Sequence, residues 1–340
     1  MRKWRTFVVV MLAWLCGCGS DTGRPPIPAR VGVDWRSIAG NPILLPGPCP
    51  SWNCLGAGDP ALASAPTGSL LLWATTGGDQ GGPVIARASA DPGLSFDWSP
   101  AAPVIGIAMA GAWDRFIETP SLSWDTSATR WRMFYLGYRD SGFVEPAIGM
   151  MFSGDSAGIQ WTRPALPIYR PTPGAWDGVF VTGPCGVRGP DGVWRVYYTG
   201  AGTTVGIGLL TSLDGLTWAP HPQNPVFERR LGAWDESVLE PCVRHVDGRW
   251  HLWYSGFVEP LAPDTRIAIG HAISNDGVTW VRDPDGPVLS PGFPGSWNDL
   301  RVLSPDVLQR ADGSLLLAAY GFSNAAIGTT VGWIGLWESP

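Results

Sequence analysis

The sequence predicts an all-β chain that folds, over residues 33–340, as one five-bladed β-propeller with four antiparallel strands in each blade. The composition favours short strands and many turns, because the 340 residues include 45 Gly and 33 Pro. A phrase with a marker tryptophan occurs five times, at Trp52, Trp113, Trp176, Trp234 and Trp297. The markers are 61, 63, 58 and 63 residues apart, which leaves room for four short strands and their turns in each repeat.

Each repeat divides into four strand-like segments joined by turns. In the fourth copy, Asp247-Gly248 lies between the first two segments and Asp276-Gly277 between the last two. The third copy has Asp191-Gly192 and Asp214-Gly215 at the same places. An Asp-Gly pair between alternating apolar segments is a strong hairpin signal, with positive φ expected at both residues. The segments are therefore predicted to form antiparallel pairs.

The last repeat is too short for a complete blade. The 44 residues from Trp297 to Pro340 cover only three strands. A matching fourth segment lies near the N-terminus, at residues 33–47, and resembles residues 279–292, the fourth strand of the preceding repeat. We therefore expect residues 33–47 to complete the last blade and close the ring, which also protects the edges of the sheets.

The first residues have the pattern of an export signal. Three basic residues precede an unbroken apolar segment, residues 7–15, which is too short to span a bilayer. The Leu-Cys-Gly-Cys that follows resembles the lipobox of bacterial lipoproteins, which implies cleavage before Cys18 and a lipid on that residue. We expect a signal peptide at 1–17, a linker at 18–32, and a protein held at the outer membrane or cell surface, with membrane contact only through its lipid. The alternative is an ordinary cleaved signal with an unmodified Cys18.

Charge and histidine spacing exclude two classes of protein. Loss of the three basic residues with the signal lowers the net charge from −6 to −9, which argues against nucleic acid as a partner. The four histidines show no metal-ligand spacing, so we expect no metal and no other cofactor.

Four cysteines remain after the signal, an even number in an oxidising compartment. Cys49 and Cys54 are close enough in sequence for a local disulfide. Cys185 and Cys242 follow a proline at equivalent positions of adjacent repeats, and a second bridge there depends on whether the strand geometry permits it.

The innermost strand of each blade lines the axis of a propeller, so equivalent residues on these strands converge. The equivalent positions, each just before a proline, are Asp59, Thr119, Gly183, Glu240 and Ser304. Asp59 and Glu240 belong to blades separated by only one other blade, so we expect their carboxylates to face one axial pocket. A carboxylate pair suits glycoside hydrolysis, with Glu240 as general acid and Asp59 as general base. The alternative is purely structural, with Asp59 capping a turn and Glu240 bonding a neighbouring blade.

Several phrases resemble the five-bladed glycoside hydrolases of families 43 and 32: IGHAISNDGVTW, IGLLTSLDGLTW and WHLWYSG, together with the five-blade plan. The resemblance covers the whole chain after the signal. It implies a catalytic aspartate before proline on the first inner strand, matched by Asp59, and a glutamate on a later inner strand, matched by Glu240. The family's third carboxylate falls at Gly183. Glu118 is our candidate replacement, and Asp177, within the repeated Trp-Asp phrase, is the weaker one.

Together these features predict a monomeric enzyme that cleaves glycosidic bonds of an oligo- or polysaccharide. Most marker tryptophans are expected to fill the wedge between blades, and Trp52, Arg115 and Asp306 are candidate substrate contacts. The alternative is a non-catalytic surface propeller that binds a glycan or a protein partner, which the glycine at position 183 favours. A third possibility is a scaffold whose channel is plugged by side chains.

Overall fold

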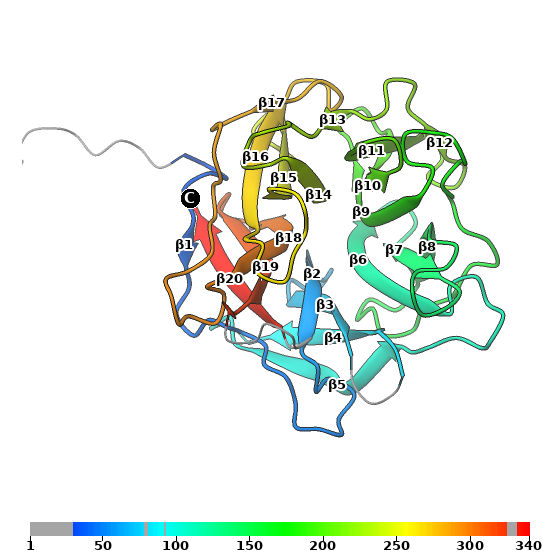
Figure 1. Cartoon of the computed structure of the whole chain (residues 1–340). Helices are drawn as coiled ribbons and strands as arrows, with labels where there is room; N and C mark the ends of the chain where they lie inside the picture. Colours follow the sequence, from blue (N-terminus) through cyan, green and yellow to red (C-terminus); the bar gives the residue numbers. More distant parts are fainter. Residues whose placement is uncertain (1–29, 78–80, 92, 325–331) are drawn as a thin grey trace, which may run out of the picture.

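A computed structural model describes residues 30–77, 81–91, 93–324 and 332–340. In this part of the chain the strands form five antiparallel sheets arranged around a central axis, without an α-helix (Figure 1). The prediction of an all-β, five-bladed propeller is confirmed. Residues 1–29, which include the expected signal peptide and Cys18, lie outside the described residues. None of the described segments is a helix long and apolar enough to cross a membrane.

Each blade begins at the axis with its innermost strand, and the strands that follow it in the sheet lie progressively farther from the axis. The innermost strands are β2 (Ala57–Ser64), β6 (Phe116–Asp125), β9 (Phe180–Arg188), β14 (Ser237–Val246) and β18 (Arg301–Gln309). The second strands are β3 (Leu70–Thr76), β7 (Arg130–Tyr138), β10 (Trp194–Ala201), β15 (Arg249–Phe257) and β19 (Leu315–Phe322). The third strands are β4 (Val84–Ala90), β8 (Ala147–Ser153), β11 (Val205–Ser212), β16 (Ala268–Ser274) and β20 (Trp333–Ser339). The outer strands are β1 (Arg36–Ser37), β5 (Phe96–Ile105), β12 (Ala219–Pro220), β13 (Phe227–Glu228) and β17 (Val281–Arg282).

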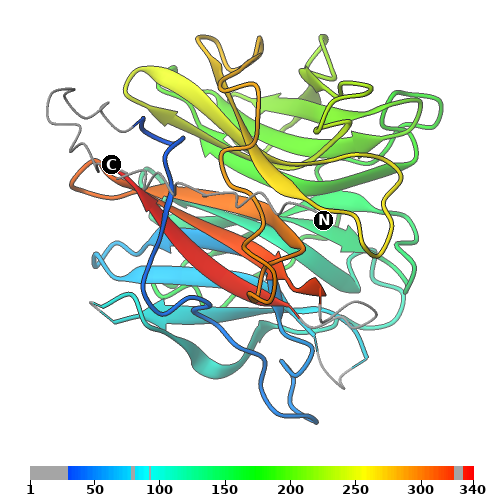
Figure 2. The same ribbon diagram turned by 60° about the vertical axis from the view of Figure 1, so that its left-hand side comes forward.

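The N-terminal segment closes the ring, as predicted. Strand β1 pairs antiparallel with β20, opposing Arg36 to Glu338, and Leu44 forms a further bridge to Ile334. In Figures 1 and 2 the blue N-terminal segment runs beside the red C-terminal strand. The N-terminal segment and the C-terminal strand thus belong to one blade, and their pairing closes the ring.

The second blade departs from the predicted four strands. Its sheet has only β6, β7 and β8, and the outer position is marked by isolated bridges from Ile148 to Tyr169 and from Phe152 to Thr162. The segment that should form the fourth strand, residues 163–173, contains four prolines. This segment contacts the sheet only at these bridges; its prolines alone do not account for the difference, since β12 (Ala219–Pro220) contains a proline and still pairs with β11.

The turns between strands follow two different designs. Asp247 and Gly248 both have positive φ, 49° and 78°, as the hairpin signal predicts. In the other three Asp-Gly pairs only the glycine does, so the prediction of positive φ at both residues is wrong there. At Asp214, for example, the carboxylate accepts hydrogen bonds from the backbone N–H groups of Leu216 and Thr217. These turns are closed by the aspartate side chain and need only one left-handed residue.

The marker tryptophans have the packing role expected of them. Trp234 stacks on Tyr254 with ring centroids 6.0 Å apart and lies against Gly256, where a Cβ would approach the ring to 2.6 Å. The neighbouring Asp235 accepts a hydrogen bond from the Tyr254 hydroxyl at 2.9 Å. The same trio recurs in blades two and three as Trp113, Asp114 and Tyr135 and as Trp176, Asp177 and Tyr198. Asp177 is therefore part of the blade's packing, away from the axis.

The four described cysteines divide into one disulfide and two thiols. Cys49 and Cys54 are bonded to each other, as predicted. Cys185 and Cys242 are free and buried, so a bridge between them is not formed. Each sulfur instead accepts a backbone N–H from the next inner strand, Cys185 from Val243 at 3.1 Å and Cys242 from Val307 at 3.2 Å. The sulfurs are used to join neighbouring blades.

Candidate active site

All five innermost strands bulge at the same place. The residue at this position has a left-handed backbone, with φ of 48°, 51°, 54°, 52° and 50° at Asp59, Thr119, Gly183, Glu240 and Ser304. The pairing of each inner strand with its neighbour shifts register at this point. A bulge re-aims a side chain, and these residues line one axial cavity together with the prolines that follow them. The predicted convergence of the five inner strands is observed.

Left-handed φ is costly for residues other than glycine, so neighbouring groups must hold these positions. A hydroxyl on the second strand of the preceding blade accepts the backbone N–H of the bulged residue. Thr199 holds Glu240 in this way at 2.7 Å, and Ser255 holds Ser304 at 2.9 Å. The strained geometry is thus fixed by contacts between blades.

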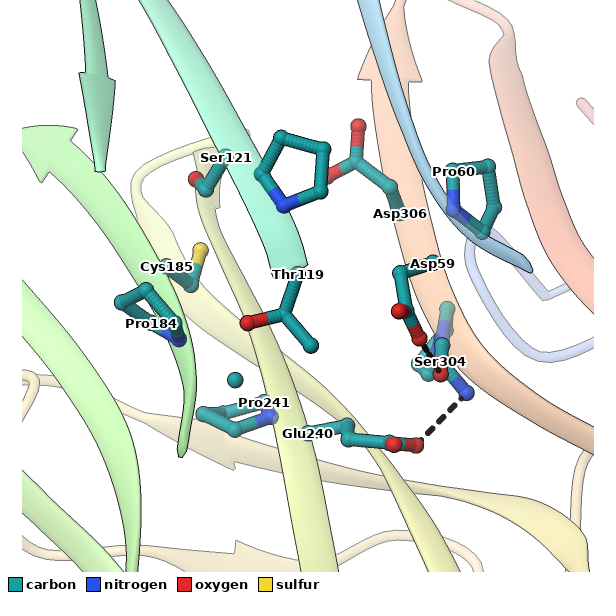
Figure 3. Close-up of a pocket in the computed structure, with 13 residues that line it drawn as sticks. Asp59, Pro60, Thr119, Ser121, Pro184, Cys185, Glu240, Pro241, Ser304 and Asp306 are labelled. Atoms are coloured by element: carbon teal, nitrogen blue, oxygen red, sulfur yellow. Dashed lines mark hydrogen bonds between the residues drawn. The ribbon is translucent and has the colours of Figure 1, made fainter. Parts of the chain in front are cut away.

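Asp59 and Glu240 meet at a single serine. The Ser304 hydroxyl donates to Asp59 at 2.9 Å, and its backbone N–H donates to Glu240 at 2.9 Å (Figure 3). The two bonded oxygens are therefore within ~9.5 Å of each other, since one serine spans the gap. Glu240 also accepts a hydrogen bond from the Ser255 hydroxyl at 2.8 Å. Both carboxylates are fixed in place, and sequence reasoning did not identify Ser304 as their link.

Two cavities adjoin the pair: Asp59 lines both, and Glu240 lines the smaller one. One, of about 370 Å³, is lined by Asp59, Glu118 and Tyr320 and forms the front cavity of the channel. The other is a waist of about 30 Å³ among the five bulges, which has room for about two waters. The waist also includes the buried hydroxyl of Thr119, which has no hydrogen-bond partner in the described chain. The channel is therefore open in front of Asp59 and narrows at the waist, so it is not plugged along its whole length.

The carboxylates of Asp59 and Glu240 differ in the groups that stabilise their charge. Burial, and then the charge of Asp59, raise the pKa of Glu240 to about 7. Burial also raises the pKa of Asp59, but hydrogen bonds from Ser304, Thr75 and Thr119 oppose this. Each carboxylate has three hydrogen-bond contributions, so the donors do not distinguish them; the charge of Asp59, which raises the pKa of Glu240, is what favours the proton on Glu240.

Glu118 is the third carboxylate of the site. It lies on β6, lines the front cavity with Asp59, and accepts a hydrogen bond from the Tyr138 hydroxyl at 2.7 Å. Burial raises the pKa of Glu118 to about 7, with a smaller contribution from the charge of Asp59. Glu118 therefore shares the front cavity with Asp59, and its role as a replacement for the missing carboxylate stays a prediction.

Replacing Glu118 by glutamine is expected to alter how stability depends on pH. The folded pKa of Glu118, about 7, exceeds the usual 4.5, so its contribution to stability is complete below pH 4.5 and is lost as the pH rises through 7. The glutamine variant should therefore gain about 2 kcal/mol over the wild type at pH 8, and little at pH 4.5. Urea unfolding at both pH values measures this. Glu228→Gln, at an exposed glutamate, is the control, and an equal change at both pH values contradicts the assignment.

Gly183 cannot carry the missing aspartate without displacing Glu240. A Cβ at Gly183 would lie 3.0 Å from the Glu240 Cα and 3.3 Å from its Cγ. Gly183 also has a φ of 54°, in the left-handed region. The glycine is therefore matched to the close approach of Glu240.

The three predicted substrate contacts lie in different places. Asp306 lines the waist, but its carboxylate is bound by the Arg244 guanidinium at 2.6 Å and by the backbone N–H of Leu62 at 2.6 Å. Trp52 packs edge-on against Trp98, and the Arg115 guanidinium lies over Phe116. Neither Trp52 nor Arg115 is among the described residues that line the front cavity or the waist. In this structure all three side chains are held by other protein groups.

Comparison with known proteins shows the fold to be that of propeller glycoside hydrolases. A glycoside hydrolase from Parabacteroides distasonis ATCC 8503, described as putative, superposes with a TM-score of 0.68 at 16% identity over 90% of this chain and 96% of that one. A thermostable family-43 glycoside hydrolase matches with 0.65 at 15% over 83% and 88%. The β-1,2-mannobiose phosphorylase of Listeria innocua, solved with β-1,2-mannobiose, matches with 0.67 at 14% over 90% and 96%.

Sequence comparison gives one distant relative and no family. No family model matches the chain. A protein of Mycobacterium tuberculosis (strain CDC 1551 / Oshkosh), itself uncharacterised, is 25% identical over 246 residues, which are 70% of this chain and 79% of that protein. At these identities the comparisons establish a five-bladed propeller architecture shared with enzymes that cleave glycosidic bonds.

Proposed function

We propose that the protein hydrolyses a glycosidic bond of an oligo- or polysaccharide where the front cavity meets the waist, because Asp59 lines both cavities and Glu240 lines the waist. The observation that carries the proposal is the pair of hydrogen bonds by which Ser304 fixes Asp59 and Glu240 beside one cavity. Hydrolysis needs a protonated acid at the leaving oxygen and an ionised carboxylate for the attack at the anomeric carbon. Because the charge of Asp59 raises the pKa of Glu240, Glu240 is the acid and Asp59 is the base. Glu118 tunes the charge of the cavity.

The lining of the channel favours water over phosphate as the attacking group. Phosphorolysis requires cationic side chains to hold the phosphate. No arginine, lysine or histidine is found among the described residues that line the front cavity and the waist, and the only lysine of the sequence is Lys3. The carboxylates would repel a phosphate instead.

A panel of aryl glycosides and plant and microbial polysaccharides tests this proposal. We expect new reducing ends in phosphate-free buffer and no increase when inorganic phosphate is added. Free sugar should be the product, since water takes the anomeric position. A sugar phosphate as the product would show phosphorolysis.

The second candidate function is non-catalytic glycan binding, which Gly183 favours because it leaves the inner strands one carboxylate short. The two functions differ in a simple outcome. Binding on a glycan array without hydrolysis of any bound glycan supports the second function and excludes the first.

We also propose that the protein is exported and anchored by a lipid on Cys18. It would then bind its substrate or ligand at the cell envelope. The basic start, the short apolar segment and the Leu-Cys-Gly-Cys sequence support this. Metabolic labelling with an alkyne fatty acid should mark the wild type and not the Cys18→Ala variant.

A further inference from the structure

The channel has a second mouth on the opposite face of the propeller. On β2, Asp59 lies near the beginning of the strand and Ser64 at its end, and residues at the ends of the inner strands surround a cavity of about 500 Å³. We call this cavity the rear vestibule. Its walls come from all five blades, with Ser64, Trp124, Arg188, Arg244 and Gln309 among them.

Aromatic side chains form one wall of the rear vestibule. Trp124 is half-buried and meets Trp131 edge-on at 5.0 Å between ring centroids. Trp194 lies between two guanidinium groups, at 4.4 Å from Arg132 and 5.7 Å from Arg188. These contacts fix the rings before any ligand arrives, and a rigid aromatic surface of this kind suits the apolar face of a sugar ring.

Polar groups without protein partners face the same space. The Ser123 hydroxyl is buried and accepts and donates no hydrogen bond in the described chain. Arg188 is exposed, uses only its Nε, toward the Gly192 carbonyl at 3.2 Å, and has no carboxylate within ion-pairing distance among the described residues. Its two terminal amino groups are therefore available to a ligand.

The other charges of the rear vestibule are already paired. Arg244 is bound to Asp306 at 2.6 Å, and Asp125 to Arg132 at 2.8 Å. The positive charge of Arg188 is left over, in a chain whose net charge is −6. The front cavity has the opposite character, with carboxylates and no cation among its described lining residues.

We propose that the rear vestibule is a second saccharide-binding site, for an acidic sugar whose ring lies against Trp124 and whose carboxylate is bound by Arg188. A planar guanidinium with two free amino groups matches a carboxylate in a bidentate pair. Binding here requires no catalysis, so the inference stands apart from the function of the front cavity.

Calorimetric titration of the whole protein tests the proposal. The probes are uronic-acid trisaccharides of mannuronate, guluronate, galacturonate and glucuronate, each paired with its carboxyl-reduced, neutral counterpart. We expect at least one acidic trisaccharide to bind, its neutral counterpart to bind at least about tenfold more weakly, and Arg188→Gln to weaken the acidic one by a similar factor.

Two control variants separate this site from others. Arg36→Gln removes an exposed arginine on the outer strand β1 and should leave binding unchanged. Glu240→Gln should also leave it unchanged, because Glu240 lines the waist and not the rear vestibule. The proposal is overturned if no acidic trisaccharide binds, if Arg188→Gln binds as the wild type does, or if Glu240→Gln removes the binding.

Discussion

Glutamine in place of Glu240 is expected to lower the rate of glycoside hydrolysis by about 10²–10⁴-fold, the usual contribution of a general acid. The amide can still accept the hydrogen bonds from Ser255 and Ser304, so the bulge and the cavity should keep their shape. It cannot deliver a proton to the departing oxygen. The loss should therefore be large for a natural glycosidic bond and small for an aryl glycoside whose leaving group needs no proton. Comparing the rates of the two substrates in variant and wild type measures this.

The control is Glu228→Gln, at an exposed glutamate on β13, which should hydrolyse both substrates at the wild-type rate. An equal loss for both substrates in Glu240→Gln would contradict the role of Glu240 as acid. Undiminished hydrolysis of both would remove Glu240 from the mechanism altogether.

The second large effect is expected for Asp59→Asn, again about 10²–10⁴-fold on hydrolysis. Asparagine tolerates the left-handed backbone that position 59 requires, where φ is 48°. Because the charge of Asp59 contributes to raising the pKa of Glu240 to about 7, its removal should lower the pKa of Glu240. Titration of the Glu240 carboxyl carbon by NMR detects this change even in an inactive variant.

Asp97→Asn, at an exposed aspartate of the same blade, serves as the control and should change neither the rate nor the titration of Glu240. If Asp59→Asn loses activity while the pKa of Glu240 stays near 7, the two carboxylates do not interact as the structure indicates.

The fold was predictable because one blade is repeated five times and each copy carries the same packing unit. The spacing of the marker tryptophans determines the blade length, and the short last repeat reveals the ring closure at residues 33–47. What could not be predicted depends on local chemistry. Blade two has only isolated bridges where a fourth strand was expected, and the side chain of Asp214 replaces a left-handed residue in its turn.

The sequence was sufficient to predict which strands and which of their residues face the axis, but not the contacts between these residues. Equivalent positions before proline identified Asp59 and Glu240 as axial residues. Ser304 was placed in the same ring, and the proline after each axial residue is a signal that could have predicted the bulge. The link that Ser304 makes between the two carboxylates depends on how the side chains are placed, which the sequence does not reveal. The fit of Gly183 to Glu240 is likewise a matter of distance: the other four bulged residues have the same left-handed φ with a side chain, but a Cβ at position 183 would lie 3.0 Å from the Glu240 Cα.

The most direct measurement of the central claim is a crystal structure of the Glu240→Gln variant soaked with an oligosaccharide that the wild type hydrolyses. We predict a sugar that enters through the front cavity and reaches the mouth of the waist, with its glycosidic oxygen within hydrogen-bond distance of the residue 240 amide and its anomeric carbon facing Asp59. A substrate bound elsewhere, with the side chains of Asp59 and residue 240 turned away from it, would contradict the claim.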